Sequence, residues 1–342
     1  MAYIELSQSN FFHNLDIITQ RVKNKEKIAI VLKDNAYGHG LIQMAKMAKE
    51  YGVKHAIVRD LNEAQEIKAL FESILILADM PTTKVDAPMH IVINDLSIIT
   101  KLLPGTKVEL KIDSGMHRNG IDPDELEIAV DQIIAAKLEF VGLFTHHRSA
   151  DTLSSEFFWQ KKNFELIKEY CKELCQKKKL PQPRLHSLNS AGTFRDEQID
   201  EQIVRVGIAA YGLLQMQAPL YQPDLKPVLS LWAEKIHTFS ADSQMLMGYN
   251  GKGSIQKEEQ LSTYDIGYGD GLLRLNDTQQ YQTHEGVKLI GRVSMDNIIA
   301  NSQSEKLKLI HDANDYAKAA QTISYEVTTR LHPKLKRKII TN

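Results

Sequence analysis

Eight short aliphatic segments, recurring between helical patterns, constrain the fold more than any other feature of this sequence. Most of them lack the apolar–polar alternation of a half-exposed strand, which is typical of strands buried on both faces of a parallel sheet. Eight strands alternating with helices predict an α/β fold of the (β/α)8 TIM-barrel type, with a doubly wound open sheet as the alternative. The segments are Ile28–Lys33, His55–Val58, Ile74–Leu77, Ile91–Ile93, Val108–Ile112, Phe140–Thr145, Arg184–Leu188 and Val204–Ala210.

Three helical segments between these strands carry start signals or an apolar stripe. Residues 62–71 follow Asp60, and residues 124–137 open at Pro123-Asp124-Glu125, where a proline and acidic side chains favour a first helical turn. The longest segment, 154–178, has one apolar stripe, formed by Phe157, Phe164, Ile167, Cys171 and Leu174.

The character of the sequence changes after residue 212. Prolines at 219, 223 and 227 interrupt a linker, and short strand patterns separated by Gly, Asn and Asp follow it. These patterns are Leu229–Ile236, Leu261–Ile266 and Val287–Val293, with a helix near 313–320. We predict a barrel over residues 8–225 and a smaller, mostly β domain over residues 226–342, with residues 1–7 as a candidate strand of the second domain.

Charge and hydropathy exclude several classes of protein. The chain has 42 basic and 43 acidic side chains, a balance that provides no field to attract nucleic acid or an anionic membrane. No segment approaches the length of about 18 apolar residues that a membrane span needs, and no signal peptide is predicted. Cys171 and Cys175 are interpreted as reduced thiols of a cytoplasmic protein. No His/Asp/Cys cluster has metal-ligand spacing, so no metal site and no metal-dependent aldolase is predicted.

Barrel enzymes place their sites at the carboxyl ends of the strands, so chemistry is sought there. The first strand closes on Lys33, where partial desolvation lowers an amine's pKa and makes it a nucleophile for a carbonyl. The alternative is an ordinary lysine that reaches water. The following Asn35-Ala36-Tyr37-Gly38-His39-Gly40 favours the first interpretation, because its glycines allow close backbone approach and Tyr37 can offer a hydroxyl to a phosphate.

Further polar residues follow the fifth and sixth strands. Arg118 lies in Lys111-Ile112-Asp113-Ser114-Gly115-Met116-His117-Arg118-Asn119-Gly120 and suits bidentate capture of a carboxylate, although a surface arginine is the alternative. His146 follows the sixth strand and, taken alone, is more often a structural histidine.

The seventh and eighth strands end in groups that suit a phosphate. Asn189-Ser190-Ala191 begins a helix, so Ser190 can act as a helix cap, as a phosphate ligand or as both. The last loops of a barrel commonly hold a phosphate, and Gly207 with the Ile208 amide suits that role. Arg205 also lies near the end of the eighth strand. It can be interpreted as an ordinary arginine that pairs with a surface carboxylate.

Three more motifs lie in the second domain. Gly267-Tyr268-Gly269-Asp270-Gly271 is compatible with a tight turn that exposes its aromatic residue. Met295 in Gly291-Arg292-Val293-Ser294-Met295-Asp296 is compatible with a core methionine, and Tyr325 in Thr322-Ile323-Ser324-Tyr325-Glu326 with an aromatic packed on a helix face.

Taken in order, these eight motifs closely resemble those of alanine racemases, a family with a barrel plus a β domain. The resemblance implies pyridoxal 5'-phosphate as cofactor, bound covalently by Lys33, with Tyr37, Asn189, Ser190, Gly207, Ile208 and Tyr325 around it. It implies that His146 stacks on the pyridine ring, that Arg205 meets the pyridine nitrogen, and that Lys111 is carbamylated and orients Arg118.

The resemblance also implies the reaction and the assembly. Inversion of an α-carbon needs a base on each face, and Lys33 and Tyr268 are implied as the two bases. Arg118 and Met295 are implied at the substrate carboxylate, in a homodimer that shares its active sites and supplies D-alanine for peptidoglycan. A serine or broad-specificity racemase of the same fold stays open, and a non-catalytic pyridoxal-phosphate carrier is a second alternative.

Four departures from the family pattern stand out. His147-Arg148 replaces small or aromatic residues, and Ser294 stands where cysteine is usual. The segment between Asp296 and Thr322 is short, and the C-terminal segment lacks the family's Arg-Val-Pro-Arg. The last two differences leave the outer structure of the second domain open.

Overall fold

Eight parallel strands form a closed barrel in the computed structural model, which describes residues 1–81, 83, 85–275 and 280–341. The strands are β2 (Ile28–Val31), β3 (His55–Val58), β4 (Ser73–Ile76), β5 (Met89–Ile93), β6 (Lys107–Lys111), β7 (Glu139–Phe144), β8 (Arg184–His186) and β9 (Val204–Val206). The strands pair in the order β8, β7, β6, β5, β4, β3, β2 and β9. The Arg205 amide donates to the Leu188 carbonyl at 2.9 Å and joins the two ends. The barrel is confirmed, and the open sheet is excluded.

Six of the eight barrel strands end earlier than the sequence predicted, and the early ends of β2 and β9 bear on the site. Strand β2 stops at Val31, so Lys33 begins the next segment instead of closing the strand. Strand β9 stops at Val206, because the chain turns there with Tyr211 N donating to Gly207 O at 3.2 Å. Both corrections move functional groups from a strand into the turn above it, where the backbone amides are no longer used by the sheet.

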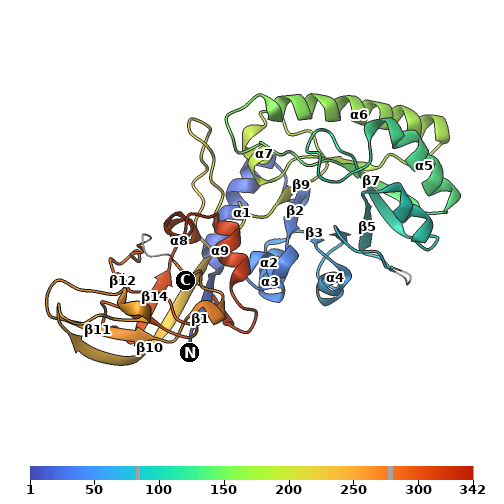
Figure 1. Ribbon diagram of the computed structural model, residues 1–342. Coiled ribbons are helices and arrows are strands. Elements are labelled where there is room, and N and C mark those ends of the chain that lie inside the picture. Colours follow the sequence, from blue (N-terminus) through green and yellow to red (C-terminus); the bar gives the residue numbers. More distant parts are fainter. Residues whose placement is uncertain (82, 84, 276–279, 342) are drawn as a thin grey trace.

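Helices cover the outside of the barrel. They are α1 (Gln8–Val22), α3 (Leu41–Tyr51), α4 (Leu61–Ile67), α5 (Leu126–Ala135), α6 (Glu156–Lys178) and α7 (Ser190–Arg195), with short 3-10 turns between them. The predicted stripe of α6 is buried, and Cys171 and Cys175 are free, buried thiols. Figure 1 shows α5 and α6 on the side of the barrel away from the second sheet. None of the described helices is long and apolar enough to cross a membrane.

A second sheet contains both the first and the last strand of the chain. Its strands are β1 (Tyr3–Ser7), β10 (Leu229–Ala241), β11 (Glu259–Tyr264), β12 (Leu289–Ile290), β13 (Ile298–Ala300), β14 (Lys306–Ile310) and β15 (Lys336–Ile340). Strand β1 runs antiparallel to β10 and parallel to β15. The strand predicted over 287–293 is reduced to β12, because Gly291 turns the chain with a φ of 71°. The division at residues 225 and 226 stays a prediction.

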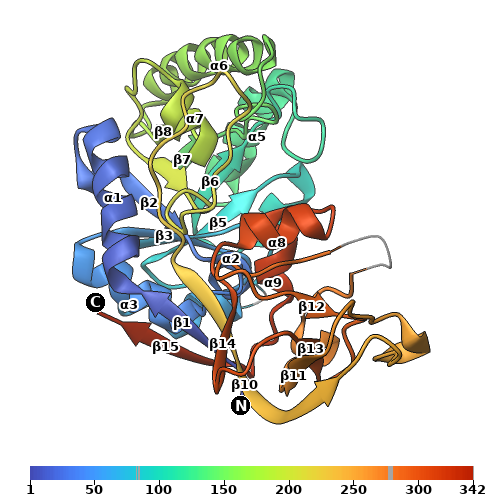
Figure 2. The same cartoon turned by 90° about the vertical axis from the view of Figure 1, so that its left-hand side faces the viewer.

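Two short helices connect this sheet to the barrel. Helix α8 (Ala313–Ala319) lies where a helix was predicted, whereas α9 (Ser324–Arg330) was not predicted. Helix α9 contacts α2 (Lys33–Tyr37), the segment that follows the first barrel strand, and both views show the two side by side (Figures 1 and 2). The second domain therefore supports the mouth of the barrel.

A substitution at Gly212 can test how tightly the segment between the barrel and β10 is packed. It has a φ of +78°, and a Cβ there would overlap the Lys226 carbonyl. Gly105 has a nearly identical φ of +79° but nothing within 4 Å. We expect Gly105→Ala to lower the free energy of unfolding by about 1 kcal/mol through the backbone alone. Gly212→Ala should cost about 1–3 kcal/mol more, measured by urea unfolding, and equal losses would contradict this packing.

Candidate active site

A cavity of about 510 Å³ lies at the carboxyl ends of the barrel strands. Its described lining includes five cationic side chains and one carboxylate: Lys33, Lys111, Arg118, Arg148 and Arg205, with Asp151. The other predicted barrel residues, Tyr37, His146, Asn189, Ser190, Gly207 and Ile208, also line it, as does Tyr325 of α9. Such an excess of positive charge in a concave site indicates an anionic ligand.

The segment after Lys33 has an unusual backbone. Four successive residues, Asp34 to Tyr37, have φ between 53° and 56°, a left-handed turn that costs roughly 1–2 kcal/mol per residue for side chains other than glycine. The turn is held from outside, because Glu63 accepts from the Asn35 amide at 2.8 Å and from the Arg59 amide at 2.9 Å. Strain of this kind clusters at functional sites. The Lys33 amine itself forms no hydrogen bond or ion pair with any residue that the structure describes.

Ser190 is prepared to meet an acceptor. Its hydroxyl oxygen accepts from the Gly207 amide at 3.1 Å and from the Ala209 amide at 3.2 Å. A hydroxyl has two acceptor sites and one donor, so only its O–H is left for a ligand. The helix cap is Asn189 and not Ser190, since the Asn189 carboxamide oxygen accepts from Gly192 N at 2.8 Å. Asn189 therefore takes the cap role that was considered for Ser190, and the role of Ser190 as a phosphate ligand stays a prediction.

Backbone and tyrosine donors complete this end of the cavity. The Ile208 amide has no hydrogen-bond acceptor among the described residues, whereas the Gly207 amide is already committed to Ser190. A Cβ on Gly207 would lie 2.9 Å from the Tyr37 hydroxyl, so glycine allows Tyr37 to approach. The Tyr37 and Tyr325 rings lie 5.6 Å apart, and burial raises the pKa of Tyr325 to about 12 and that of Tyr37 further. Both phenols are therefore neutral donors at physiological pH.

Arg205 is fixed on the barrel floor. Its Nη1 lies 2.7 Å from His186 Nδ1, and its Nη2 donates to the carbonyls of Thr145 at 2.7 Å and Ser187 at 2.8 Å. Burial lowers the pKa of Arg205 to about 10, so the guanidinium is still charged at neutral pH. Its Nε–H has no acceptor among the described residues and is available to the cavity.

A loop and a strand end supply the remaining cations. Asp113 Oδ1 accepts from three amides, of Gly115, Met116 and His117, at 2.9 to 3.1 Å, and thereby shapes the loop that carries Arg118. Burial, with repulsion from Arg118 and Arg205, lowers the pKa of Lys111 to about 8. The Lys111 amine donates to the Asn119 carboxamide oxygen, a contact that the sequence did not indicate.

His146 is a neutral side chain in this surrounding. Burial, followed by the charges of Arg205, Arg118 and Lys111, lowers its pKa well below the usual range. A neutral imidazole can pack face-on against an aromatic ligand without adding to the positive charge of the cavity.

Tyr268 and Met295 do not line this cavity within one chain. They lie together in the second domain, where Gly269 N donates to Met295 O at 2.9 Å and Tyr268 N to Ser294 O at 3.0 Å. Their side chains are 42% and 53% exposed. The family resemblance implied that these two residues join Lys33 in one site across a dimer. Within a single chain they lie apart from the cavity that Lys33 lines.

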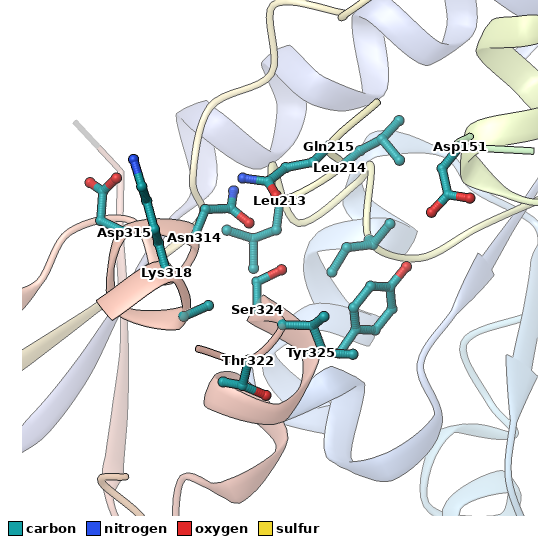
Figure 3. A pocket seen from close by; sticks show the side chains of 13 residues that line it. Asp151, Leu213, Leu214, Gln215, Asn314, Asp315, Lys318, Thr322, Ser324 and Tyr325 are labelled. Carbon is teal, nitrogen blue, oxygen red and sulfur yellow. The ribbon is translucent and has the colours of Figure 1, made fainter. Parts of the chain in front are cut away.

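A second cavity of about 540 Å³ adjoins the first on the side of α8 and α9. Asp151, Ile208, Leu214 and Tyr325 line both cavities. Figure 3 shows the Tyr325 ring at the border of the second cavity with its hydroxyl on the side of Asp151. Tyr325 therefore lies at the border between the cationic cavity and a cavity of similar volume beside the second domain.

Sequence reasoning missed the polar residues beneath Arg205. His186 and Glu109 are completely buried inside the barrel and hydrogen-bonded to each other at 2.8 Å. The available signal was Glu109 inside the strand pattern Val108–Ile112, beside a strand that carries His90.

The fold and the cationic cavity define a class of two-domain enzyme, a parallel barrel whose mouth is covered by a C-terminal β domain. Two family models match the chain, "Alanine racemase, N-terminal domain" over residues 6–215 and "Alanine racemase, C-terminal domain" over residues 228–339. The chain belongs to the alanine racemase family, whose members are pyridoxal-phosphate-dependent isomerases.

Individual relatives agree with this assignment. The chain is 41% identical to the alanine racemase of Nitratiruptor sp., covering 98% of this chain and 99% of that protein. It is 39% identical to the alanine racemase of Campylobacter concisus, covering 99% and 100%. The crystal structure of alanine racemase from Bacillus anthracis with bound L-Ala-P superposes with a TM-score of 0.87 at 27% identity, covering 100% of this chain and 95% of that one.

Ser190→Ala tests the donor arrangement at this end of the cavity. It leaves the Gly207 and Ala209 amides without their acceptor, so we expect a loss of about 1–3 kcal/mol in the free energy of unfolding. Ser190→Thr keeps the hydroxyl and should lose less. Inorganic phosphate should raise the unfolding temperature of the unmodified protein more than that of Ser190→Ala, as scanning calorimetry can measure. Equal shifts would contradict a donor role for this hydroxyl.

Proposed function

We propose that this chain interconverts L-alanine and D-alanine with pyridoxal 5'-phosphate as cofactor. The observation that carries the proposal is Lys33, whose amine has no partner among the described residues and which lines a cavity together with four other cationic side chains. When bound, pyridoxal phosphate withdraws electrons from the α-carbon of an amino acid and so makes its α-proton removable.

The residues in the cavity fit this cofactor. The Ser190 O–H, the Ile208 amide and the phenols of Tyr37 and Tyr325 would hold its phosphate, because each has a donor left to give. Asn189 would support this end of the site as the cap of the helix that presents Ser190. The Arg205 Nε–H would meet the pyridine nitrogen, and neutral His146 would pack on the ring.

The remaining residues act on the substrate. Arg118 would bind the carboxylate of alanine, since a guanidinium forms a bidentate pair with that group. Lys33 Nζ would remove or return the α-proton on one face. Tyr268 Oη would do so on the other face, because one base cannot serve both sides of a planar carbon. Met295 would lie beside the substrate carboxylate.

The exposed positions of Tyr268 and Met295 favour a homodimer. Both lie outside the cavity of their own chain, and Tyr268 is as exposed as a surface residue. In a two-fold dimer, the second domain of each subunit would complete the partner's site. We further propose that the enzyme is cytoplasmic and that its D-alanine supplies peptidoglycan synthesis.

We also propose that Lys111 is carbamylated and then orients Arg118. A pKa of about 8 leaves a neutral fraction of the amine near physiological pH, and carbon dioxide reacts only with the neutral form. The contact with Asn119 would have to open for the carbamate to form.

The cofactor assignment predicts a coloured protein. After reconstitution with pyridoxal phosphate, we expect a visible absorption band that borohydride abolishes, with the label on Lys33 in a peptide map. Lys33→Ala should remain colourless, whereas Lys111→Ala, which changes the other cavity lysine, should still be labelled on Lys33. A colourless protein, or a label on another lysine, would overturn the proposal.

Subunit mixing tests the shared site. Lys33→Ala and Tyr268→Phe homodimers are each expected to lose L-alanine racemisation by at least a hundredfold, since each lacks one of the two bases. After dissociation and random reassociation, half of the dimers are hybrids with one intact site, so about a quarter of the original activity should return. A mixture as inactive as its parents would contradict a site built from two subunits.

A further inference from the structure

The interior of the barrel contains a chain of buried polar groups that ends at Arg205. Arg205 Nη1 lies 2.7 Å from His186 Nδ1, and His186 Nε2 lies 2.8 Å from Glu109 Oε2. His186 and Glu109 are 0% exposed. The three residues come from strands β9, β8 and β6, so the chain crosses the inside of the barrel.

The direction of the hydrogen bonds is determined from both ends. An arginine only donates, so His186 Nδ1 must accept from Arg205. Burial alone would raise the pKa of the Glu109 carboxyl, but Arg184 and the bonds from His186 and His90 lower it well below its usual range. An ionised carboxylate only accepts, so His186 Nε2 must carry the proton. Both ends require the same tautomer of a neutral imidazole, and burial lowers the pKa of His186 to about 3.

The barrel is built to hold this carboxylate. Glu109 on β6 is paired with Gly142 on β7, and a Cβ on Gly142 would overlap the Glu109 carboxylate. On the other side, Glu109 Oε1 accepts from His90 Nδ1 at 2.8 Å and from Arg184 Nη2. A charge buried so completely is stable only with such partners.

We propose that Glu109 is a positioning residue for the reaction. It fixes the tautomer of His186, and His186 in that tautomer gives Arg205 its only side-chain acceptor among the described residues. With Nη1 and Nη2 held in this way, the Nε–H of Arg205 is aimed at the cavity. The consequence for catalysis rests on the proposed function, in which that N–H meets the cofactor's ring nitrogen. The tautomer assignment does not depend on it.

Glu109→Gln tests this inference with almost no change in shape. The glutamine oxygen must stay with Arg184, an obligatory donor, so its NH2 group faces His186 Nε2. His186 then has to accept there and carry its proton on Nδ1, opposite the donor of Arg205. In protein without cofactor, nitrogen-15 histidine NMR should show the His186 proton on Nε2 for the unmodified chain and on Nδ1 for the variant.

Activity gives the second readout. In enzyme loaded with pyridoxal phosphate, Glu109→Gln should lower kcat for L-alanine by about tenfold with little change in KM, since the groups that would bind the substrate are untouched. Ser73→Ala is the matched control, because Ser73 contacts Arg184 at 2.9 Å and His55 at 2.8 Å but neither Glu109 nor His186. It should leave the His186 tautomer and kcat unchanged.

The results of these experiments distinguish a failure of the positioning role of Glu109 from a failure of the proposed function. If Glu109→Gln fails to fold, Glu109→Asp keeps a carboxylate beside Arg184 and withdraws it from His186. Arg205 still requires Nδ1 as its acceptor, so the proton should stay on Nε2 while the Nε2 nitrogen-15 shift changes and kcat falls. An unchanged His186 tautomer in Glu109→Gln, or an unchanged kcat in the variant that folds, overturns the positioning role. If the unmodified chain binds no pyridoxal phosphate, the proposed function fails, and the tautomer result still decides whether Glu109 controls His186.

Discussion

Mutual repulsion among the cations at the barrel mouth is the interaction on which the rest of the site depends. Lys33, Lys111, Arg118, Arg148 and Arg205 line one cavity with a single described carboxylate. Burial first, and then the neighbouring cations, lower the pKa values of Lys111 and His146. The fold holds these groups together, Glu156 pairs with Arg148, and an anionic ligand would relieve the remaining repulsion. The neutral phenols, the Ser190 O–H and the Ile208 amide add donors without adding charge.

The barrel part of the site could be predicted from the sequence because parallel strands bring their carboxyl ends to one edge. Lys33, Lys111, His146 and Arg205 are far apart in the chain, yet each lies within two residues of the carboxyl end of a barrel strand. Strand periodicity therefore predicts their proximity without any knowledge of loop structure. The family resemblance added roles to these positions, and the geometry is compatible with those roles.

Other features depend on contacts that no local pattern encodes. The left-handed turn at 34–37 is held by Glu63 from another helix, so propensity alone predicts an ordinary loop there. Strands β13, β14 and β15 are short and mixed in character, and they exist because β10, β11 and β1 offer free edges. The Glu109–His186 pair was missed because periodicity marks strand interiors as apolar, whereas a barrel can enclose a charge if every bond is satisfied.

The pairing of β1 with β15 has a consequence for biosynthesis. These parallel strands are neighbours in space, from Tyr3 beside Lys336 to Ser7 beside Ile340, although almost the whole chain lies between them. During translation, β1 emerges early and one of its edges lacks a partner until β15 has left the ribosome. Contacts of such high sequence separation form late and slowly. The nascent barrel must therefore tolerate a neighbouring sheet that stays unfinished until β15 has been made.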